Sequence, residues 1–468
     1  MIERAFSLRE LEAFAELSGD RNPMHVDPIA ARRTLFGGPV VHGVCALLWS
    51  LNELARELDG QRSLASLRVV FLKPIPVDAP VRLDLSRPSA DEARIRLEVA
   101  GQKAATVRVG LAAAGCAAPG EPPDRRPERA APRAPAAAEI EGCRGSVSPC
   151  LDRKLAHELF GELMRALPPQ QVAELLATTY IVGMQCPGLH SIYSALDVTF
   201  SARASVAPLD YEVSAWDARF SRIDMGLRSP TMQGSLTAFL RPAPREQVRC
   251  ADIDQVAEGE FAGQRALVIG GSRGLGEVSA KLLAAGSAQV RVTWFRGEED
   301  ARRVTAEIRS HGGDADALRW DVLADAEQLR GAWSEEQTPT HVYYFASPFI
   351  ESTGAFSPAL FAKYCDYYVV GFVNSMQALL DLGCRPLRVL YASSVYVEQP
   401  AAGLSEYAAA KSAGEAVCDA LQHTHEHLRI LKPRLPRLAT DQTHSLLGEA
   451  SADPVPVLLE ELRRLRDR

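Results

Sequence analysis

The sequence lacks an apolar run long enough to cross a membrane, and it lacks any CxxC pair of cysteines. A spanning helix needs roughly 20 consecutive apolar residues, and no segment of this chain approaches that length. The opening residues carry acidic side chains and no continuous apolar core, so we expect no signal peptide. The nine cysteines are therefore expected to be reduced thiols of a cytoplasmic protein rather than a disulfide framework.

The chain also lacks an excess of positive charge, with 52 basic against 59 acidic residues. The formal net charge is -7 and no basic patch dominates, so we expect no general affinity for nucleic acid or for a membrane surface. Hydrophobic residues make up 47% and charged residues 24%, as in ordinary globular proteins. A chain of 468 residues is too long for one hydrophobic core, which predicts two or three domains.

Proline marks the clearest division of the chain. Residues 117–138 contain six prolines with interspersed charges, which predicts a semi-rigid surface linker. This linker separates a first domain at 1–116 from a second at 139–250. A polar joint then leads to a third domain at 260–445 and to a charged tail at 446–468, for which we expect an exposed helix.

The first two domains share a pattern. The first combines one apolar helix, near 44–58, with four alternating strands, which is an α+β arrangement. The middle domain resembles a worn repeat of it, because in both a glycine is followed three residues later by serine and then by a strand ending in phenylalanine. These residues are Gly60, Ser63 and Phe71 in the first copy, and Gly188, Ser191 and Phe200 in the other.

A short motif near the N-terminus carries candidate catalytic groups: residues 18–27 read SGDRNPMHVD. Asp20 and His25 lie five apart across an Asn-Pro turn, so both side chains can converge on one point. A carboxylate and an imidazole facing one water can add it to a conjugated double bond, or remove it. Gly43 begins the apolar helix, where its amide can stabilise charge on a thioester carbonyl. Taken singly, Asp20 could cap a turn and His25 could be a satisfied buried histidine.

The motif, with GPVVHGV and VVFLKPIPV further on, resembles the MaoC-type (R)-specific enoyl-CoA hydratases, which have the hot-dog fold. The resemblance implies that Asp20 and His25 are the catalytic pair. It also implies that Asn22 shapes the overhanging loop, that Gly43 supplies the oxyanion amide and that Ser63 lies near the pocket.

The middle domain resembles the same family at PGLHSIYS but has no GDxNPxH motif. We therefore expect a double hot-dog region, in which a non-catalytic second hot dog completes one pocket as a pseudo-dimer. In this interpretation His190 is structural.

The rear domain alternates short apolar strands with helices, which predicts an α/β Rossmann-type fold with a doubly wound parallel sheet. Its first strand leads into IGGSRGLG, which includes Ser272. The glycines at 270, 274 and 276 (Gly270, Gly274, Gly276) let the backbone approach a pyrophosphate at a helix N-terminus.

The second strand of this domain has no acid at its end. Arg296 stands just past it and Arg273 lies in the glycine loop, which favours the 2′-phosphate of NADPH over NADH. Asp321, after the next strand, is expected to hydrogen-bond the adenine.

Tyr407 and Lys411 lie one helical turn apart, so the ammonium can lower the pKa of the phenol, which then exchanges a proton with a substrate oxygen. Ser394 ends the preceding strand and can hold the same oxygen. Residues 262–440 thus resemble the short-chain dehydrogenase/reductases, which implies that these three residues are catalytic and that Lys411 also binds the nicotinamide ribose. The chain departs from the family in three places. Tyr368 stands where a catalytic Asn is usual, residues 344–347 read YFAS in place of Asn-Ala-Gly, and LKPRLPRLATDQT follows the sixth strand where a Pro-Gly is frequent.

Together the motifs predict a bifunctional enzyme of fatty-acid or polyketide assembly. It would reduce a 3-ketoacyl thioester with NADPH and dehydrate the product to the 2-enoyl thioester, or catalyse the reverse hydration. The carrier is acyl carrier protein or coenzyme A, and we expect a homo-oligomer. In the alternative, only the dehydratase is active and the rear domain is a non-catalytic nucleotide-binding or docking module. We expect no metal, since the alternating histidines of HTHEH do not gather ligands on one helix face (His423, His425, His427).

Overall fold

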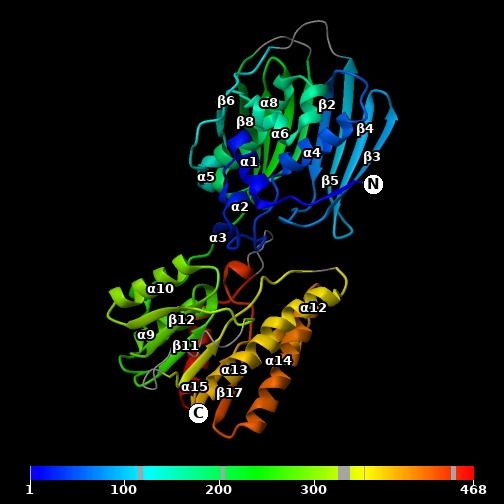
Figure 1. The fold of residues 1–468 in the computed structure, drawn as a ribbon. Helices are drawn as coiled ribbons and strands as arrows, with labels where there is room; N and C mark the ends of the chain where they lie inside the picture. The colour runs from blue at the N-terminus through cyan, green and yellow to red at the C-terminus, as the bar shows by residue number, and fades with distance from the viewer. Residues whose placement is uncertain are drawn as a thin grey trace. The chain divides into compact units, whose positions relative to one another are not determined.

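The computed structural model describes residues 2–113, 120–201, 206–324, 338–352, 354–443 and 450–467. The chain divides into two compact units, one from Met1 to Ala243 and one from Pro244 onward (Figure 1). Each unit has its own hydrophobic core. Within the described residues, none of the helices is both long and apolar enough to cross a membrane.

The described part of the first unit is a ten-stranded sheet with helices packed on it (Figure 1). Its helices are α1 (Leu8–Ser18), α2 (Pro23–Val26), α3 (Pro28–Ala31), α4 (Gly43–Ala55), α5 (Ala137–Ile140), α6 (Arg153–Leu159), α7 (Gly161–Ala166) and α8 (Pro169–Tyr180). Its strands are β1 (Ile2–Arg4), β2 (Arg62–Phe71), β3 (Val81–Ser89), β4 (Glu92–Val99), β5 (Gln102–Ala113), β6 (Arg144–Val147), β7 (Ser191–Phe200), β8 (Leu209–Asp217), β9 (Arg222–Arg228) and β10 (Met232–Leu240).

The order of these strands shows an internal repeat. The sheet runs β1-β3-β4-β5-β2-β7-β10-β9-β8-β6. In each half a long helix, α4 or α8, is followed by four strands, a short fifth strand (β1 or β6) lies at the outer edge, and the order of one half is the reverse of the other about the β2–β7 pair. That pair is antiparallel, with Ser66 opposite Thr199 and Val70 opposite Ala195. The sequence prediction of two fused hot dogs is therefore confirmed.

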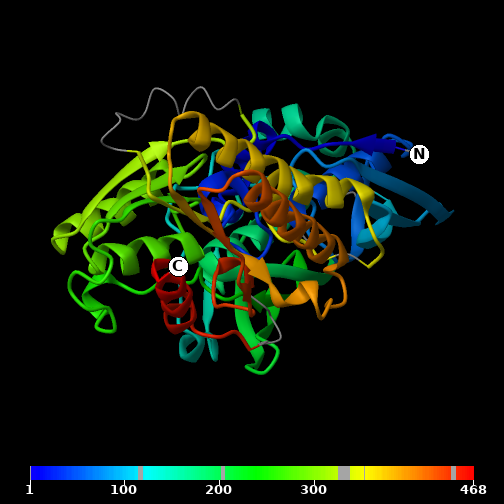
Figure 2. The ribbon, with the colours of Figure 1, turned by 90° about the horizontal axis from the view of Figure 1, so that it is seen from below.

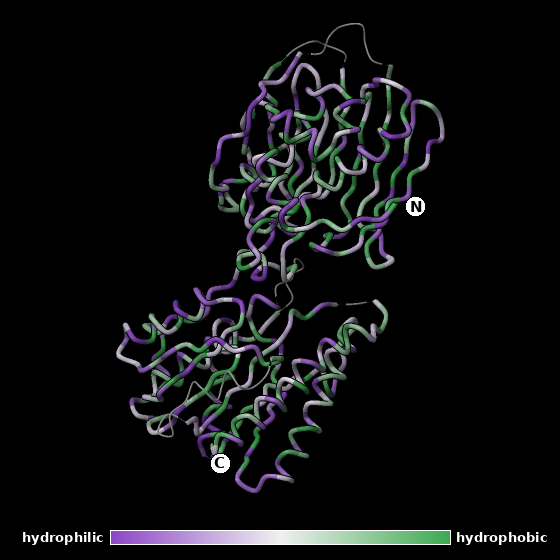
Figure 3. The backbone as a smooth tube through the Cα atoms, in the orientation of Figure 1, coloured by the Kyte–Doolittle hydropathy of each residue, from purple (hydrophilic) through white to green (hydrophobic). Residues whose placement is uncertain are grey.

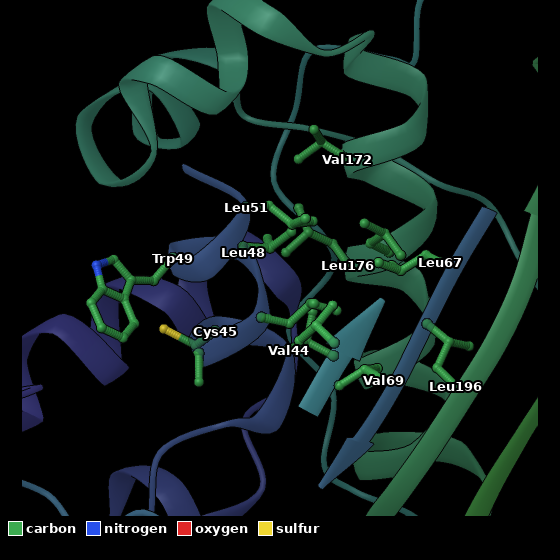
Figure 4. Packing of buried hydrophobic residues seen from close by; sticks show 14 of the residues in the cluster. Val44, Cys45, Leu48, Trp49, Leu51, Leu67, Val69, Val172, Leu176 and Leu196 are labelled. Atoms are coloured by element: carbon green, nitrogen blue, oxygen red, sulfur yellow. The ribbon is translucent and has the colours of Figure 1, made fainter. Parts of the chain in front are cut away.

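The two central helices meet at the seam between the halves. α4 and α8 lie across β2 and β7, and Figure 4 shows Leu48 and Leu51 of α4 beside Val172 and Leu176 of α8. α4 is buried along almost its whole length, because its sequence is apolar on all sides. Along β3 and β4, by contrast, buried and exposed residues alternate, and Figure 3 shows the corresponding alternation of hydropathy in this sheet.

The second unit is a six-stranded parallel sheet between two layers of helices. Its sheet order, β13-β12-β11-β14-β15-β17, is the doubly wound arrangement that the sequence predicts. The strands are β11 (Arg265–Ile269), β12 (Gln289–Trp294), β13 (Asp314–Arg319), β14 (His341–Tyr344), β15 (Leu387–Tyr391), β17 (Leu428–Leu431) and the short pair β16 (Ser393–Ser394) and β18 (Arg434–Leu435). The helices are α9 (Gly274–Ala285), α10 (Glu298–Ser310), α12 (Pro358–Cys365), α13 (Gly371–Asp381), α14 (Ser405–Thr424) and α15 (Pro454–Arg466).

The charged C-terminal helix belongs to this second core. α15 packs beside α9 (Figure 2), with Leu458, Leu459, Leu462 and Leu465 buried. The expectation of an exposed helix is wrong, because these leucines recur at helical spacing and form one buried face.

Candidate active sites

The turn after α1 carries Asp20 into the interior of the first unit. Gly19 ends α1 in the left-handed conformation, at φ 75°, and Asp20 is only 2% exposed. One carboxylate oxygen accepts a hydrogen bond from the Thr179 hydroxyl at 2.6 Å, and the other accepts one from the amide of Asn22 at 3.2 Å. Burial raises the pKa of this carboxyl, against the opposing influence of His25 and these hydrogen bonds.

His25 faces the same point from the short helix α2. Its Nδ1 lies 2.7 Å from the carbonyl oxygen of Val40; because a carbonyl only accepts, Nδ1 carries the proton, and Nε2 is the ring atom that can accept one. Burial lowers the pKa of His25, which keeps the ring neutral, and the charge of Asp20 opposes this shift.

A second histidine completes the cluster. The ring of His42 stacks on His25 with 3.8 Å between centroids, and its Nε2 donates to the backbone oxygen of Asp20 at 3.0 Å. One carboxylate oxygen of Asp20 and one ring nitrogen each of His25 and His42 all lie within 4.8 Å of one another. The Asp20 carboxylate and the His25 imidazole are therefore close enough to act on one small molecule between them.

Gly43 is the first residue of α4, and no side chain caps that helix end. A Cβ at this position would lie 3.0 Å from the ring of Phe71, so the glycine allows the ring to approach. An uncapped amide at a helix N-terminus is a natural partner for a negatively charged oxygen.

Asn22 links this loop to the second repeat. Its Oδ1 accepts a hydrogen bond from Met24 and so caps α2. Its Nδ2 donates to the carbonyl oxygens of Gly183, Gly188 and Leu189 at 3.2, 3.1 and 3.2 Å. The candidate site in the first hot dog is thus held in place by the second.

The proline-rich segment also takes part. The amide of Arg133 donates to the carbonyl of Met184 at 2.9 Å, and the Arg133 carbonyl accepts from Leu189 at 2.7 Å. Pro127 packs so closely on Gly19 that a Cβ there would lie 2.7 Å away. The described part of the segment, from 120 onward, is largely exposed, as expected of a linker, but it also clamps the turns on which Asp20 and Asn22 depend.

In the second unit, the glycine loop lies at the carboxyl end of β11, where parallel sheets bind nucleotides. Gly270 has φ 78°, and a Cβ at Gly276 would lie 2.3 Å from the carbonyl of Gly270. The loop therefore needs glycine at both positions, and it presents the N-terminus of α9. This cradle fits the pyrophosphate of a dinucleotide.

The polar residues around the loop lie at the same end of the sheet. Ser272 is buried, and Arg273 precedes α9 with a nitrogen 3.9 Å from a carboxylate oxygen of Asp441. Arg296 follows β12, with its guanidinium 5.6 Å from the ring centroid of Phe295. Asp321 follows β13 and accepts a hydrogen bond from the Leu323 amide at 3.0 Å.

Ser394, Tyr407 and Lys411 come together just beyond the carboxyl end of β15, with the Lys411 nitrogen 5.8 Å from the ring centroid of Tyr407. Burial raises the pKa of Tyr407 to about 12, and a hydrogen bond with Ser394 opposes the shift. Lys411 donates to the carbonyl of Ala392 at 2.6 Å, and burial lowers its pKa to about 7. The structure thus brings together the three groups that the sequence selects.

A model of the MaoC like domain matches residues 2–109, and a model of the short chain dehydrogenase matches residues 264–431. The chain carries a MaoC-like domain followed by a short-chain dehydrogenase domain. The resemblances stated from the motifs are confirmed.

Individual relatives cover only parts of the chain. An (R)-specific enoyl-CoA hydratase of Aeromonas caviae is 38% identical over 63 residues, which are 14% of this chain and 47% of that enzyme. The peroxisomal multifunctional enzyme type 2 of Drosophila melanogaster is 37% identical over 75 residues, 16% of this chain and 12% of that protein. A solved short chain dehydrogenase of Burkholderia cenocepacia in complex with NADP is 25% identical with a TM-score of 0.38, over 44% of this chain and 91% of that one. The chain spans less than half the length of these two curated relatives.

The structure separates Ser63 from the other candidates of the MaoC-like domain. Ser63 lies at the start of β2, partly buried, with its hydroxyl 3.4 Å from the carbonyl of Ala113. Phe71, at the far end of β2, is the residue that contacts Gly43. Because β2 and β7 are antiparallel, the counterpart that lies at the site is Ser191, which is buried at the start of β7 beside Leu189.

The short-chain dehydrogenase domain shows how Tyr368 replaces the usual asparagine. It lies in a π-helical turn, Asp366–Val370, between α12 and α13. Its ring centroid is 3.8 Å from the ammonium nitrogen of Lys411, a cation–π contact, and its hydroxyl is 2.7 Å from that of Ser347. An aromatic face thus covers one side of the Lys411 side chain.

Sequence reasoning missed the residues that the second repeat contributes. Thr179, Gly183 and Arg241 carry no motif, and their contacts span more than 150 positions in the case of Thr179 and Gly183. The only sequence feature that points to these residues is the internal repeat, because it implies that the second copy packs against the first.

Proposed function

We propose that this protein processes acyl thioesters in two steps. The short-chain dehydrogenase domain reduces a 3-ketoacyl thioester to the 3-hydroxyacyl thioester, and the MaoC-like domain removes water to give the 2-enoyl thioester, or adds it in reverse. The observation that carries the proposal is the buried pair of Asp20 and His25 beside the uncapped helix end at Gly43.

The proton steps of dehydration follow from the geometry. Removal of water takes a proton from the α-carbon and delivers one to the departing 3-hydroxyl. His25, with Nδ1 fixed on Val40, has only Nε2 for such an exchange. Asp20 has a raised pKa, so it can carry a proton as well as release one. The amide of Gly43 stabilises the enolate oxygen that forms between these transfers.

In the reductase domain, Tyr407 would supply the proton to the developing alkoxide, Ser394 would hold the same oxygen, and Lys411 would bind the nicotinamide ribose. The glycine loop and Ser272 would hold the cofactor's phosphates, with Asp321 near the adenine. When bound, the reduced nicotinamide supplies the hydride. Arg273 and Arg296, with no acid at the end of β12, favour NADPH over NADH.

The carrier follows from the same chemistry: the substrate is a thioester on acyl carrier protein or coenzyme A. We further propose that the protein acts in fatty-acid or polyketide assembly in the cytoplasm, as a homo-oligomer.

A mass-shift assay tests both steps. The purified chain is incubated with 3-ketoacyl thioesters of both carriers, with NADPH and separately with NADH. The expected products have first gained two hydrogens and then lost one water, with NADPH preferred. Absence of NADPH oxidation across a broad range of acyl chains would overturn the reductase assignment.

One observation favours a second candidate, in which only the hydratase is active. Tyr368 places an aromatic ring where the family has a polar amide beside Lys411, and the rear domain would then bind a nucleotide or a partner without turnover. Titration calorimetry separates the cases: saturable NADPH binding with no ketoreduction supports a non-catalytic nucleotide-binding domain, and binding with turnover excludes it.

A further inference from the structure

Arg241 is a buried cation in the first unit that the reaction described above does not use. It directly follows β10, the last strand of the second hot dog, and only 4% of it is exposed. Its main-chain amide donates to the carbonyl of His190 at 2.8 Å, and its Nη2 donates to the carbonyl of Leu189 at 2.8 Å. Its Nε and Nη1 are buried without a hydrogen-bond partner among the described residues.

This guanidinium also has no counter-ion among the described residues. Burial is what lowers its pKa, to about 10, and no carboxylate offsets that burial. A buried charge of this kind is costly unless it is paired. Lys281 in the second unit shows the ordinary solution, since this buried ammonium pairs with both Glu277 and Glu307, at 2.9 and 2.8 Å.

Arg241 lies at the hydratase site. The Leu189 carbonyl that accepts from Arg241 also accepts from the side chain of Asn22, at 3.2 Å. His25 and His190 both experience the positive charge of Arg241. Arg241 and Asn22 of the candidate site thus share one backbone oxygen.

We propose that Arg241 is a substrate-binding residue of this site, whose unsatisfied guanidinium donors hydrogen-bond a carbonyl-type oxygen of the acyl thioester. The inference rests on the proposed hydratase function. Nε and Nη1 point in different directions, so a single oxygen meets one of them, and the charge of the planar guanidinium suits an oxygen that becomes negative. A ligand oxygen would satisfy a buried donor and compensate the charge, as no group of the described chain does. The non-catalytic repeat would thus supply a positive charge to the catalytic one.

Two oxygens of the substrate have this chemistry: the thioester oxygen, which becomes an enolate during the reaction, and an amide carbonyl of the pantetheine arm. The same hydration assay distinguishes them. It is run with a 2-enoyl thioester of coenzyme A and with the same acyl group on N-acetylcysteamine, which lacks most of the arm.

The variants are Arg241→Gln, Arg241→Lys and the control Arg222→Gln. Arg222 lies on β9 of the same repeat, is exposed and pairs with Asp224. We expect Arg241→Gln to lower kcat/KM by about 10- to 100-fold, the usual effect of losing a hydrogen bond to a charged group. A loss with both substrates, mainly in kcat, identifies the thioester oxygen. A loss confined to the coenzyme A substrate, mainly in KM, identifies the arm.

The pH profile provides a readout that a purely structural defect would not move. Besides burial, Asp20 and Arg241 act on the pKa of His25, Asp20 raising it and Arg241 lowering it, and His25 in turn lowers the pKa of the neighbouring His42. Removing the positive charge in Arg241→Gln should raise the pKa of His25, so the acid limb of the hydration profile moves to higher pH. Arg241→Lys retains the charge but loses the planar guanidinium donors, so it should leave that limb in place while kcat/KM still falls.

Unchanged kcat/KM for both Arg241 variants with both substrates would overturn the inference, and so would a loss of activity in Arg241→Lys that only follows a lowered melting temperature. An inactive wild-type chain would instead contradict the proposed hydratase function.

Discussion

Replacing Gly183 by alanine places a methyl group against the candidate catalytic carboxylate from the opposite repeat. Gly183 lies in the π-helical turn Ile181–Gln185 after α8, and its φ is not positive, so the backbone tolerates alanine. The new Cβ would lie 2.2 Å from one carboxylate oxygen of Asp20 and 2.5 Å from the other. Non-bonded heavy atoms rest at about 3.5 Å, so the carboxylate must retreat by about 1 Å.

That retreat should cost activity rather than stability. The buried hydrogen bond from Thr179 that is lost is worth about 1 kcal/mol of stability, and the preference for alanine over glycine in a helical turn, also about 1 kcal/mol, offsets that loss. The movement disrupts the 2.6 Å hydrogen bond from Thr179 and the alignment with His25. A misplacement of about 1 Å commonly costs about 100-fold in rate, so we expect hydration by Gly183→Ala to fall by about that factor.

The assay follows the loss of enoyl-thioester absorbance, with the melting temperature and ketoreduction measured on the same sample. Gly161→Ala is the matched control, because Gly161 begins α7 in the same unit and a Cβ there meets nothing within 4 Å. Hydration by Gly183→Ala at the wild-type rate, with the fold intact, would refute the view that this glycine holds the carboxylate in place.

Four further substitutions test other parts of the structure. Asp20→Asn should abolish dehydration and leave ketoreduction intact; loss of both activities in a folded protein would contradict two independent sites. Tyr407→Phe should do the reverse, lowering ketoreduction by about 100-fold or more, as measured by NADPH oxidation. Asn22→Ala leaves buried carbonyls without their donor and should lower the unfolding free energy by about 1–3 kcal/mol in urea titrations. Lys411 has a folded pKa of about 7 against 10.5 when solvated, so the unfolded chain binds the extra proton between these values and stability rises with pH there. Lys411→Met should remove that rise, and a persisting slope would assign it to other groups.

Local spacing accounts for what the sequence determines here. Asp20 and His25 are five residues apart, and Tyr407 and Lys411 four, so a turn and one helical turn suffice to bring each pair together. The glycine loop is equally local, because its close approaches join Gly270 to Gly276. The apolar periodicity of the strands and helices predicts an α+β front and a doubly wound rear, and the resemblance to the MaoC-type hydratases adds the hot-dog fold.

The tertiary structure decides what lies opposite those local groups. The antiparallel pairing of β2 with β7 sends Ser63 to one end of the sheet and brings Ser191 to the other, where the Asp20 loop lies. Likewise, Gly183 and Arg241 reach the site only because two repeats close on each other, and no spacing within either repeat encodes that contact. The sequence shows which side chains have the chemistry for catalysis. Their position, burial and electrostatic surroundings depend on the packing of one hot dog against its copy.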